Sequence, residues 1–386
     1  MSKNVLITGC NGYIGNAIVQ RMLSKGYNVT GIDNDSKITW LKEMKSISAI
    51  DVFDPVEKVN KIKNKWNNYQ YYNVDISKEK QIRKFFEQYN DFDTIINLAQ
   101  MPSAPYSQIN LEHASWTIQN NTIGCLNILW MMKEYCPDAH LIEIESMGTF
   151  NPAINVDIPE NKFQFEYNGR TSEPCIFPKS AGSFYHSSKV FNTYLNEATN
   201  RWWGIKSTII NQGVVYGNYT PEIEQSLIHS HLSVDEAMGT IINRFIVQAL
   251  IGCPLTVYGD GDQKRGFLAL NDSVQCLELF VDNPSKDGEM RIVNQLDEVF
   301  TMNQLADKVV KVGHKHGINV KVDHIKSPRI ENTKNFYYNP VTDTLIRLGF
   351  KQTRTVEDEI EFAFKHINSD TLKQLKNVVI PKITWK

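Results

Sequence analysis

Short apolar runs alternate with amphipathic segments over the first 210 residues of the chain. An apolar run at 5–7 is followed by apolar residues at helical spacing over 17–25 and by a second strand-like run at 27–33. This alternation predicts further strands at 70–75, 94–98, 141–144 and 207–210 and helices at 78–89, 116–135 and 183–201. Strands that alternate with helices predict an α/β fold with a doubly wound parallel sheet covered on both faces.

Three segments depart from this alternation. Residues 34–70 are polar and rich in Lys and Asn, and their helical patterns predict a helical excursion after the second strand. Residues 151–180 contain four prolines and predict a long loop, which we expect at the active site because long loops in compact enzymes are usually functional. From residue 218 the elements are short and mixed. They predict a smaller mixed α/β C-terminal lobe over 218–386, with some segments that return to the sheet.

The composition is that of an ordinary globular protein, with 41% apolar and 22% charged residues among 386, enough for two domains. A net charge of −2 gives no global field to attract nucleic acid or an anionic membrane. The six cysteines form no CxxC pair and no zinc-ligand spacing with His, so we expect reduced thiols and no metal site. No signal peptide and no apolar stretch near roughly 20 residues are present, which predicts a cytoplasmic protein.

A glycine-rich turn follows the first strand. Glycine lets the backbone turn tightly and approach a pyrophosphate, and the N-terminus of the following helix attracts the anion. Asp33 ends the second strand, 18 residues after Gly15, where a carboxylate accepts hydrogen bonds from the ribose hydroxyls and repels a 2′-phosphate. The pattern predicts a Rossmann-type domain over 1–217 that binds NAD in preference to NADP. The expected contacts are Gly9, Gly12, Tyr13, Ile14, Gly15, Asp33 and Asn34.

Later strands are expected to extend this cofactor site. Asp75 and Ile76 follow the third strand, where an acidic side chain can read the adenine amino group. Leu98 and Ala99 end the fourth strand and are expected to pass beneath the dinucleotide.

Tyr185 and Lys189 form a YxxxK pair on the predicted helix at 183–201. Residues i and i+4 share one helix face, so the Lys189 ammonium is expected to lie near the phenol and to lower its pKa from the usual value of about 10. Tyr185 is therefore a candidate general base, and Ser146, just past the fifth strand, is a candidate donor to the same substrate oxygen. His186 is either a second acid/base group or a structural neighbour of Tyr185.

These motifs fall in the order seen in extended short-chain dehydrogenases/reductases that modify nucleotide sugars, and the chain resembles this family over its whole length. The resemblance implies NAD as cofactor, a UDP-sugar as substrate, and a homodimer formed through the helices at 116–135 and 183–201. It implies that Asn211, Arg265 and Arg329 meet the substrate diphosphate. It also adds Asn121 to the cofactor site and Tyr106, Thr149, Arg244 and Tyr258 to the substrate site.

Within that family the chain is most similar to the UDP-sulfoquinovose synthases, which implies UDP-glucose and sulfite as substrates. The segments that carry this likeness are SAPYS (103–107), NGRT (168–171), SFYHSSKV (183–190), NQGVVYG (211–217) and PLTVYGDGDQKRGFL (254–268).

Three departures from the pattern of those synthases matter, of which Ser146 in place of a threonine is an ordinary exchange. A motif similar to TMGEY reads SMGTF here, so Thr149 lacks the carboxylate implied to act at C5 or C6 of the sugar. Pro102 stands where the resemblance implies an arginine that receives sulfite. Three residues could supply the lost functions: His186, and Lys179 and Arg170 in the loop at 151–180.

Two other functions stay open. A UDP-sugar 4-epimerase, or a relative that modifies C5 and C6, shares the oxidation at C4, and an epimerase needs no extra carboxylate, so Thr149 suits it. A non-catalytic nucleotide-binding scaffold of the same fold would be expected to lose Tyr185 or Lys189, and both are present.

Overall fold

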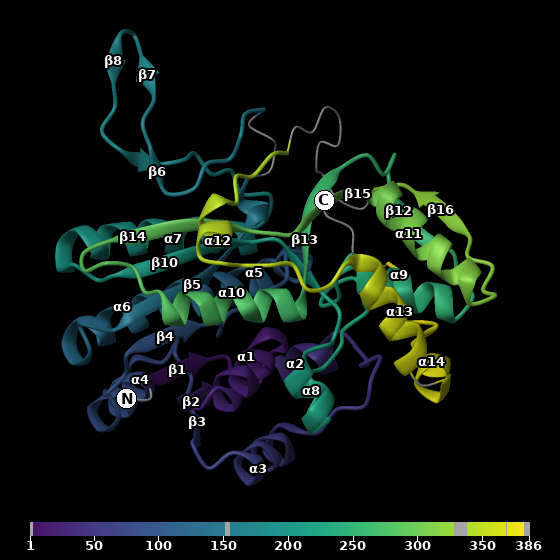
Figure 1. Ribbon diagram of the computed structural model, residues 1–386, viewed down its shortest axis with the longest axis horizontal. Coiled ribbons are helices and arrows are strands. Elements are labelled where there is room, and N and C mark those ends of the chain that lie inside the picture. Colours follow the sequence, from purple (N-terminus) through teal and green to yellow (C-terminus); the bar gives the residue numbers. More distant parts are fainter. Residues whose placement is uncertain (1–2, 151–154, 328–337, 368, 382–386) are drawn as a thin grey trace.

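Seven parallel strands form the central sheet of the protein, for which a computed structural model describes residues 3–150, 155–327, 338–367 and 369–381 (Figure 1). The sheet confirms the predicted doubly wound α/β fold. In spatial order its strands are β14 (Met290–Gln295), β10 (Ser207–Gln212), β5 (His140–Ser146), β4 (Thr94–Asn97), β1 (Asn4–Thr8), β2 (Asn28–Asp33) and β3 (Tyr69–Asn73).

Helices cover both faces of the sheet because side chains alternate along each strand. Val5 and Ile7 of β1 pack in the same apolar cluster as α1 and α10, whereas Leu6 packs with α4 and α6. The helices on the first face are α1 (Tyr13–Ser24), α3 (Pro55–Lys65) and α10 (Leu270–Asp282), and those on the second are α4 (Glu79–Gln88), α6 (Gly124–Tyr135) and α7 (Phe184–Trp203).

The helix predicted at 116–135 begins earlier than expected and is interrupted. It starts as α5 (Leu111–Ile118), since the Asn110 side chain accepts a hydrogen bond from the His113 N–H (3.0 Å) and so caps the helix. A π-helical turn, Gln119–Ile123, then joins α5 to α6. Turns of this kind are found mostly inside α-helices, often at functional sites.

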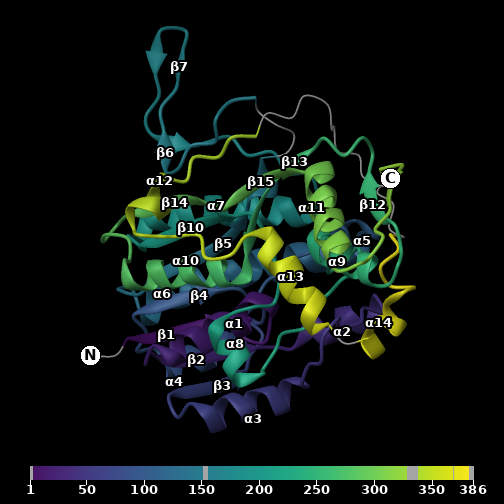
Figure 2. The same ribbon diagram turned by 45° about the vertical axis from the view of Figure 1, so that its right-hand side comes forward.

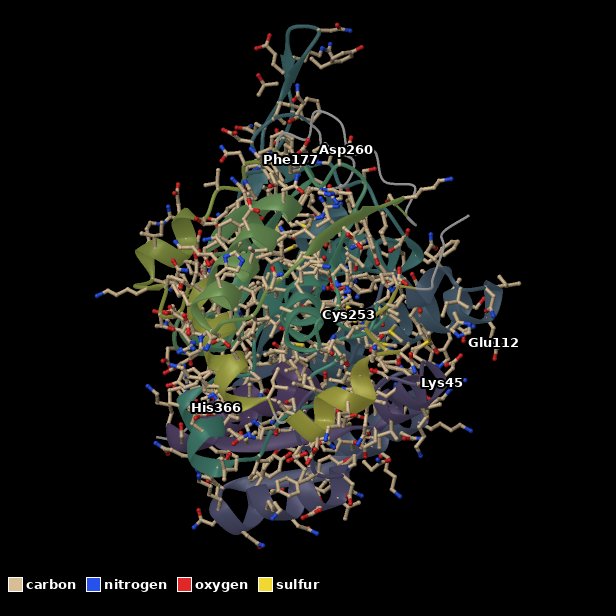
Figure 3. All side chains as sticks on the ribbon, turned by 90° about the vertical axis from the view of Figure 1, so that its right-hand side faces the viewer. Lys45, Glu112, Phe177, Cys253, Asp260 and His366 are labelled. Atoms are coloured by element: carbon tan, nitrogen blue, oxygen red, sulfur yellow. The ribbon has the colours of Figure 1, made fainter. Side chains whose placement is uncertain are left out.

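The excursion at 34–70 contains the predicted helical structure, as α2 (Ser36–Glu43) and α3. Helix α2 packs against α5, with the rings of Trp40 and Trp116 at 4.8 Å between centroids. Lys45, just after α2, and Glu112 of α5 lie toward the same edge of the molecule in Figure 3. The excursion therefore packs against the body of the protein through α2, directly after the second strand.

The predicted loop at 151–180 contains two small antiparallel hairpins, which sequence analysis did not anticipate. Strand β6 (Lys162–Phe163) pairs with β9 (Cys175–Ile176), and β7 (Glu166–Tyr167) pairs with β8 (Arg170–Thr171). The β7–β8 hairpin projects away from the body in Figures 1 and 2. Arg170 is exposed on this hairpin.

A second lobe follows residue 213, with its own apolar cluster. It contains β11 (Val214–Tyr216), β13 (Lys264–Ala269) and β15 (Glu298–Thr301) in one sheet and β12 (Leu255–Tyr258) with β16 (Val322–Ile325) in another. Its helices are α9 (Ile241–Leu250), α11 (Met302–Lys315) and α13 (Val356–His366), and α14 (Ser369–Leu375) contacts α9. Helix α8 (Pro221–Ser226) packs instead on α1, and α12 (Asp343–Arg347) packs beside β14. The β14 and α10 segments return to the central sheet. Nowhere in the described ranges is a helix both long and apolar enough to cross a bilayer.

A buried arginine ties α1 to the helices beside it. The Arg21 guanidinium pairs with Glu222 of α8 (Nε to Oε1, 2.5 Å) and with Glu278 of α10 (Nη1 to Oε2, 2.9 Å). It also donates to the Asn271 side chain (2.9 Å). A buried charge whose partner is removed is strongly destabilising, because the remaining charge stays desolvated.

We predict that Arg21→Met lowers the free energy of unfolding by about 3 kcal/mol. The variant keeps an apolar stem of similar length but leaves Glu222 without its cation, whereas Lys25 still pairs with Glu278 (2.8 Å). Urea unfolding at neutral pH measures the change. Arg83→Met, which breaks an exposed pair with Glu79 and Glu134, is the control and should alter stability little. Equal effects of the two variants would contradict the prediction.

Candidate active site

A large cavity of about 1210 Å³ opens at the carboxyl ends of the central strands. Its walls come from the turn after β1 and the ends of β2, β4 and β5 on one side and from the second lobe on the other. Parallel α/β sheets bind ligands at this edge, where the strand order reverses. Here the order reverses between β1 and β4, and both strands end in the cavity.

The glycine turn is shaped for close backbone approach. Gly9 has φ +68°, and a Cβ added there would lie 2.6 Å from the carbonyl atoms of Leu98. A Cβ on Gly15 would lie 2.0 Å from the Gly9 oxygen, so the turn packs directly on the start of α1. Gly12 is the N-cap of α1 and provides no side chain to cap the first turn. The turn and the helix start therefore fit a pyrophosphate.

Asp33 lies at the end of β2 in the cavity, as predicted. Its two carboxylate oxygens accept hydrogen bonds from the backbone N–H groups of Asn11 (2.9 Å) and Asp35 (2.8 Å). Burial raises the pKa of Asp33, and the Lys58 ammonium acts in the opposite direction. Each oxygen keeps a second lone pair, so the carboxylate can still accept from a ribose hydroxyl.

Two lysines beside Asp33 were missed by sequence analysis. Lys37 and Lys58 both come from the 34–70 excursion and line the cavity. Lys58 Nζ donates to the Asn11 carbonyl (2.9 Å), and burial followed by the repulsion of Lys58 lowers the pKa of Lys37 to about 8. The available signal was the position of Lys37, four residues after Asp33. It was missed because the excursion contains many lysines and none of them stands out.

Tyr185, Lys189 and Ser146 lie together in the wall of the cavity. The Ser183 side chain caps α7. Lys189 follows Tyr185 by one helical turn, and its Nζ lies 5.8 Å from the centroid of the Tyr185 ring. Lys189 donates to the Ile144 carbonyl and to the Gln100 side chain. Ser146, at the end of β5, lines the cavity beside them.

The pKa of Tyr185 differs from the expectation. Burial raises it above its usual value, and this effect outweighs the lowering by Lys189 and by a hydrogen bond from Ser146. The predicted direction of the Lys189 effect is correct, but the predicted net lowering is wrong. Burial removes the hydration of the phenolate, and this costs more free energy than the attraction of the Lys189 ammonium returns.

His186 faces the same space from the next position of α7. Its ring centroid lies 4.9 Å from that of Tyr185, and its Nδ1 is 2.9 Å from Ser183 Oγ. A Cβ on Gly148 would lie 2.1 Å from His186 Nε2, so glycine at 148 is what allows this ring position. His186 thus has a fixed place at the cavity wall.

Two carboxylates of β5 were not identified from the sequence. Glu143 accepts from Asn97 Nδ2 (2.8 Å) and from Gln100, and burial raises its pKa to about 7. Glu145 lines the cavity, and burial raises its pKa to about 8. The signal was their spacing of two within an apolar strand, which places both on one face.

Three of the predicted substrate residues converge from the second lobe. Arg244 of α9, Tyr258 of β12 and Arg265 of β13 all line the cavity. The Arg244 guanidinium carbon lies 5.1 Å from the centre of the Tyr258 ring, and the Tyr258 hydroxyl donates to Glu236 (3.1 Å). Two cations on this wall suit an anionic substrate.

Thr149 and Tyr106 lie outside the cavity lining. The Thr149 hydroxyl is buried and donates to the Ser146 carbonyl (2.8 Å). The Tyr106 hydroxyl donates to Glu43 (2.8 Å), within the contact between α2 and the segment before α5. Both side chains therefore bond to the protein itself.

The remaining predicted residues also have partners away from the lining. Asn121 accepts from the Met101 N–H (2.8 Å) and donates to Ser188 (2.9 Å), so it braces the backbone beneath the cavity. Asn211 accepts from Lys179 Nζ (2.9 Å). Asp75 accepts from Ser77 (2.6 Å). Arg329 lies outside the described residues.

The rest of the predicted cofactor set does line the cavity. Its members are Gly9, Gly12, Tyr13, Ile14, Gly15, Asp33, Asn34, Ile76, Leu98, Ala99, Tyr185 and Lys189. The tight backbone at the glycine turn, the carboxylate at the end of β2 and the cavity between them fit the pyrophosphate and ribose of NAD.

Comparisons with known proteins agree with this geometry. The profile of the NAD dependent epimerase/dehydratase family matches residues 5–294. The chain is 34% identical to UDP-sulfoquinovose synthase of Sulfolobus acidocaldarius over 99% of this chain and 97% of that one. It is also 34% identical to the chloroplastic UDP-sulfoquinovose synthase of Spinacia oleracea, over 100% of this chain and 79% of that one. The fold is similar to that of a Thermus thermophilus UDP-glucose 4-epimerase in complex with NAD (TM-score 0.68, 18% identity, 95% and 99% covered).

We predict that Asp33→Asn narrows the preference for NAD over NADP by roughly ten- to a hundredfold, because it removes the carboxylate repulsion and leaves Lys37 and Lys58 beside a 2′-phosphate. Titration of both cofactors measures the ratio of dissociation constants. Adding Lys37→Met to Asp33→Asn should reverse part of the gain. Tighter binding of NADP than NAD by the wild-type protein would contradict the assignment of Asp33.

Proposed function

The chain belongs to the NAD dependent epimerase/dehydratase family, and from this premise we propose that it modifies UDP-glucose through a 4-keto intermediate and adds sulfite, as a UDP-sulfoquinovose synthase. The observation that carries the proposal is the meeting of Tyr185, Lys189 and Ser146 in the cavity that begins at the glycine turn. The identity of 34% to two such synthases over nearly the whole chain supports the choice of reaction.

The first step is the oxidation of the sugar at C4. NAD, when bound, accepts the hydride from C4 and later returns it. Tyr185 takes the proton of the C4 hydroxyl, Ser146 holds that oxygen, and the Lys189 ammonium stabilises the phenolate. The resulting ketone makes the proton at C5 acidic. Because burial raises the pKa of Tyr185, its phenolate is a stronger base than that of an exposed tyrosine.

The second step exchanges the C6 hydroxyl for a sulfonate. Loss of the C5 proton and of the C6 oxygen as water gives a double bond between C5 and C6. The sulfur of bisulfite then bonds to C6, and its proton ends on C5. Arg244 and Arg265 on the opposite wall are suited to the diphosphate of the substrate. Lys179 does not line the cavity and donates a hydrogen bond to Asn211 of β10. Arg170, exposed on the β7–β8 hairpin, is a poor candidate for the sulfite site.

A UDP-sugar 4-epimerase is the second candidate. Thr149 carries no carboxylate and its hydroxyl is bonded to Ser146, and Pro102 lines the cavity where an anion would need a charged donor. Burying an anion such as bisulfite without a charge-assisted donor is costly. An epimerase needs neither group, because the 4-keto sugar only rotates in the site and takes the hydride back on its other face. Thr149 and Pro102 are therefore compatible with an epimerase.

The proposal includes a homodimer and a cytoplasmic location. Large apolar side chains are exposed along α6 and α7, namely Trp130, Phe191, Tyr194 and Trp202, and a second copy can cover them. Light scattering tests this assembly. All six cysteines are free thiols, which suits a reducing compartment.

We predict that Tyr185→Phe lowers turnover by roughly 10²–10⁴-fold and leaves the affinities for NAD and UDP-glucose nearly unchanged. The substitution removes one oxygen, the proton acceptor, and little volume. Steady-state turnover and cofactor titration measure the two effects. Tyr167→Phe, on the exposed hairpin, is the matched control and should behave as wild type. Turnover of Tyr185→Phe within twofold of wild type would disprove the role.

We predict that UDP-glucose incubated with the NAD-loaded protein and excess sulfite gives a product in which a sulfonate replaces a hydroxyl. Mass spectrometry with and without sulfite measures it. Sulfonate addition is expected to be slow unless another residue supplies the groups missing at Thr149 and Pro102. An unchanged mass with an inverted C4 would replace the synthase assignment with the epimerase.

A further inference from the structure

Glu145 is a buried carboxylate that faces the cavity without a partner. It lies at the end of β5, directly before Ser146, and is 1% exposed. Neither of its oxygens has a hydrogen-bond partner among the described residues, although it lines the same cavity as Tyr185. Buried polar atoms without partners are rare, and those in a cavity are available to a ligand.

The charges around Glu145 allow it to change protonation state. Burial has the largest effect on its pKa and raises it, Lys189 and Lys179 lower it, and Glu143 raises it further. Lys179 is fixed by Asn211, which stands beside Glu145 in the register of β10 with β5. The acid form is favoured by burial and the carboxylate by two ammonium groups, so the group can hold or release a proton near neutral pH.

The other carboxylates that line the cavity lie away from Tyr185 and Ser146. Within the described ranges the lining carboxylates are Asp33, Asp35, Asp54, Glu145 and Glu236. The three aspartates belong to β2 and the excursion, at the end with the glycine turn. Glu236 accepts a hydrogen bond from Tyr258 in the second lobe. Glu145 is thus the lining carboxylate next to Tyr185 and Ser146.

We propose that Glu145 is the acid/base group that moves the C5 proton of the 4-keto sugar. The proposal rests on the function proposed above, in which C5 and C6 react after C4 is oxidised. It gives this chain a carboxylate at the end of β5, although position 149 holds a threonine whose hydroxyl is bonded to the backbone.

The proposed step balances within the site. A Glu145 oxygen takes the C5 proton, the C5–H electron pair forms the C5–C6 double bond, and the C6–O bond breaks. The proton on Glu145 passes to the departing oxygen, which leaves as water. When bisulfite adds through sulfur at C6, its proton passes through Glu145 to C5 as the double bond is saturated.

The test separates oxidation at C4 from proton transfer at C5. The NAD-loaded protein is mixed with UDP-glucose in D₂O without sulfite. The near-ultraviolet absorbance of the reduced cofactor reports the first step, and deuterium at C5, read by mass spectrometry, reports the second. Glu145→Gln should lower the ratio of the second rate to the first by roughly 10²–10⁴-fold. Glu145→Asp should recover part of the exchange.

The matched control is Glu143→Gln, an amide at the other buried carboxylate of β5. Whatever it does to both rates, it should leave their ratio unchanged. Exchange at the wild-type rate in Glu145→Gln, or equal losses in both rates, would overturn the role of Glu145 and leave the proposed function standing. Oxidation without exchange in the wild-type protein would favour the epimerase and remove the role. No oxidation of UDP-glucose would overturn the proposed function and the inference together.

Discussion

Lys189 is a buried ammonium ion, and a chain of hydrogen bonds that begins on the first strand holds it in place. Thr8 donates to Asn97 (2.6 Å), Asn97 donates to Glu143 (2.8 Å), and Gln100 joins Glu143 to Lys189. Burial alone would lower the pKa of Lys189, but the surrounding anionic groups raise it. Since a buried charge without partners costs several kcal/mol, this network sets the positions of β1, β4, β5 and α7 together.

The order of strands and helices could be predicted because each element carries its own apolar period. Features that depend on distant parts of the chain could not. The seventh strand, β14, reads as an ordinary short apolar run, and only α10, packed on α1, returns it to the side of β10. The hairpins within 151–180 are two residues per strand, too short for any period to show.

Site residues that act through their place at the end of an element could be predicted. Gly9, Asp33 and Tyr185 follow from strand ends and helix spacing, and the structure brings them to one cavity. Site residues whose role depends on the direction of the side chain could not be predicted. Thr149 occupies a motif position, but it turns back to a backbone carbonyl. Glu145 lies just past the strand predicted at 141–144, and only the fold shows that β5 includes it and that it lines the cavity.

The closeness of Glu145 to Tyr185 links the two proton transfers of the proposed reaction. A Glu145 carboxylate raises the pKa of Tyr185, and by the same interaction a phenolate opposes ionisation of Glu145. Once Tyr185 has taken the proton from the C4 hydroxyl, the phenol is neutral and that opposition ends. Glu145 then ionises more easily beside Lys189 and Lys179, at the stage when the ketone has made C5 acidic and a base is needed there. The protonation of Tyr185 during oxidation at C4 thus favours the ionised Glu145 that the next step, at C5, requires.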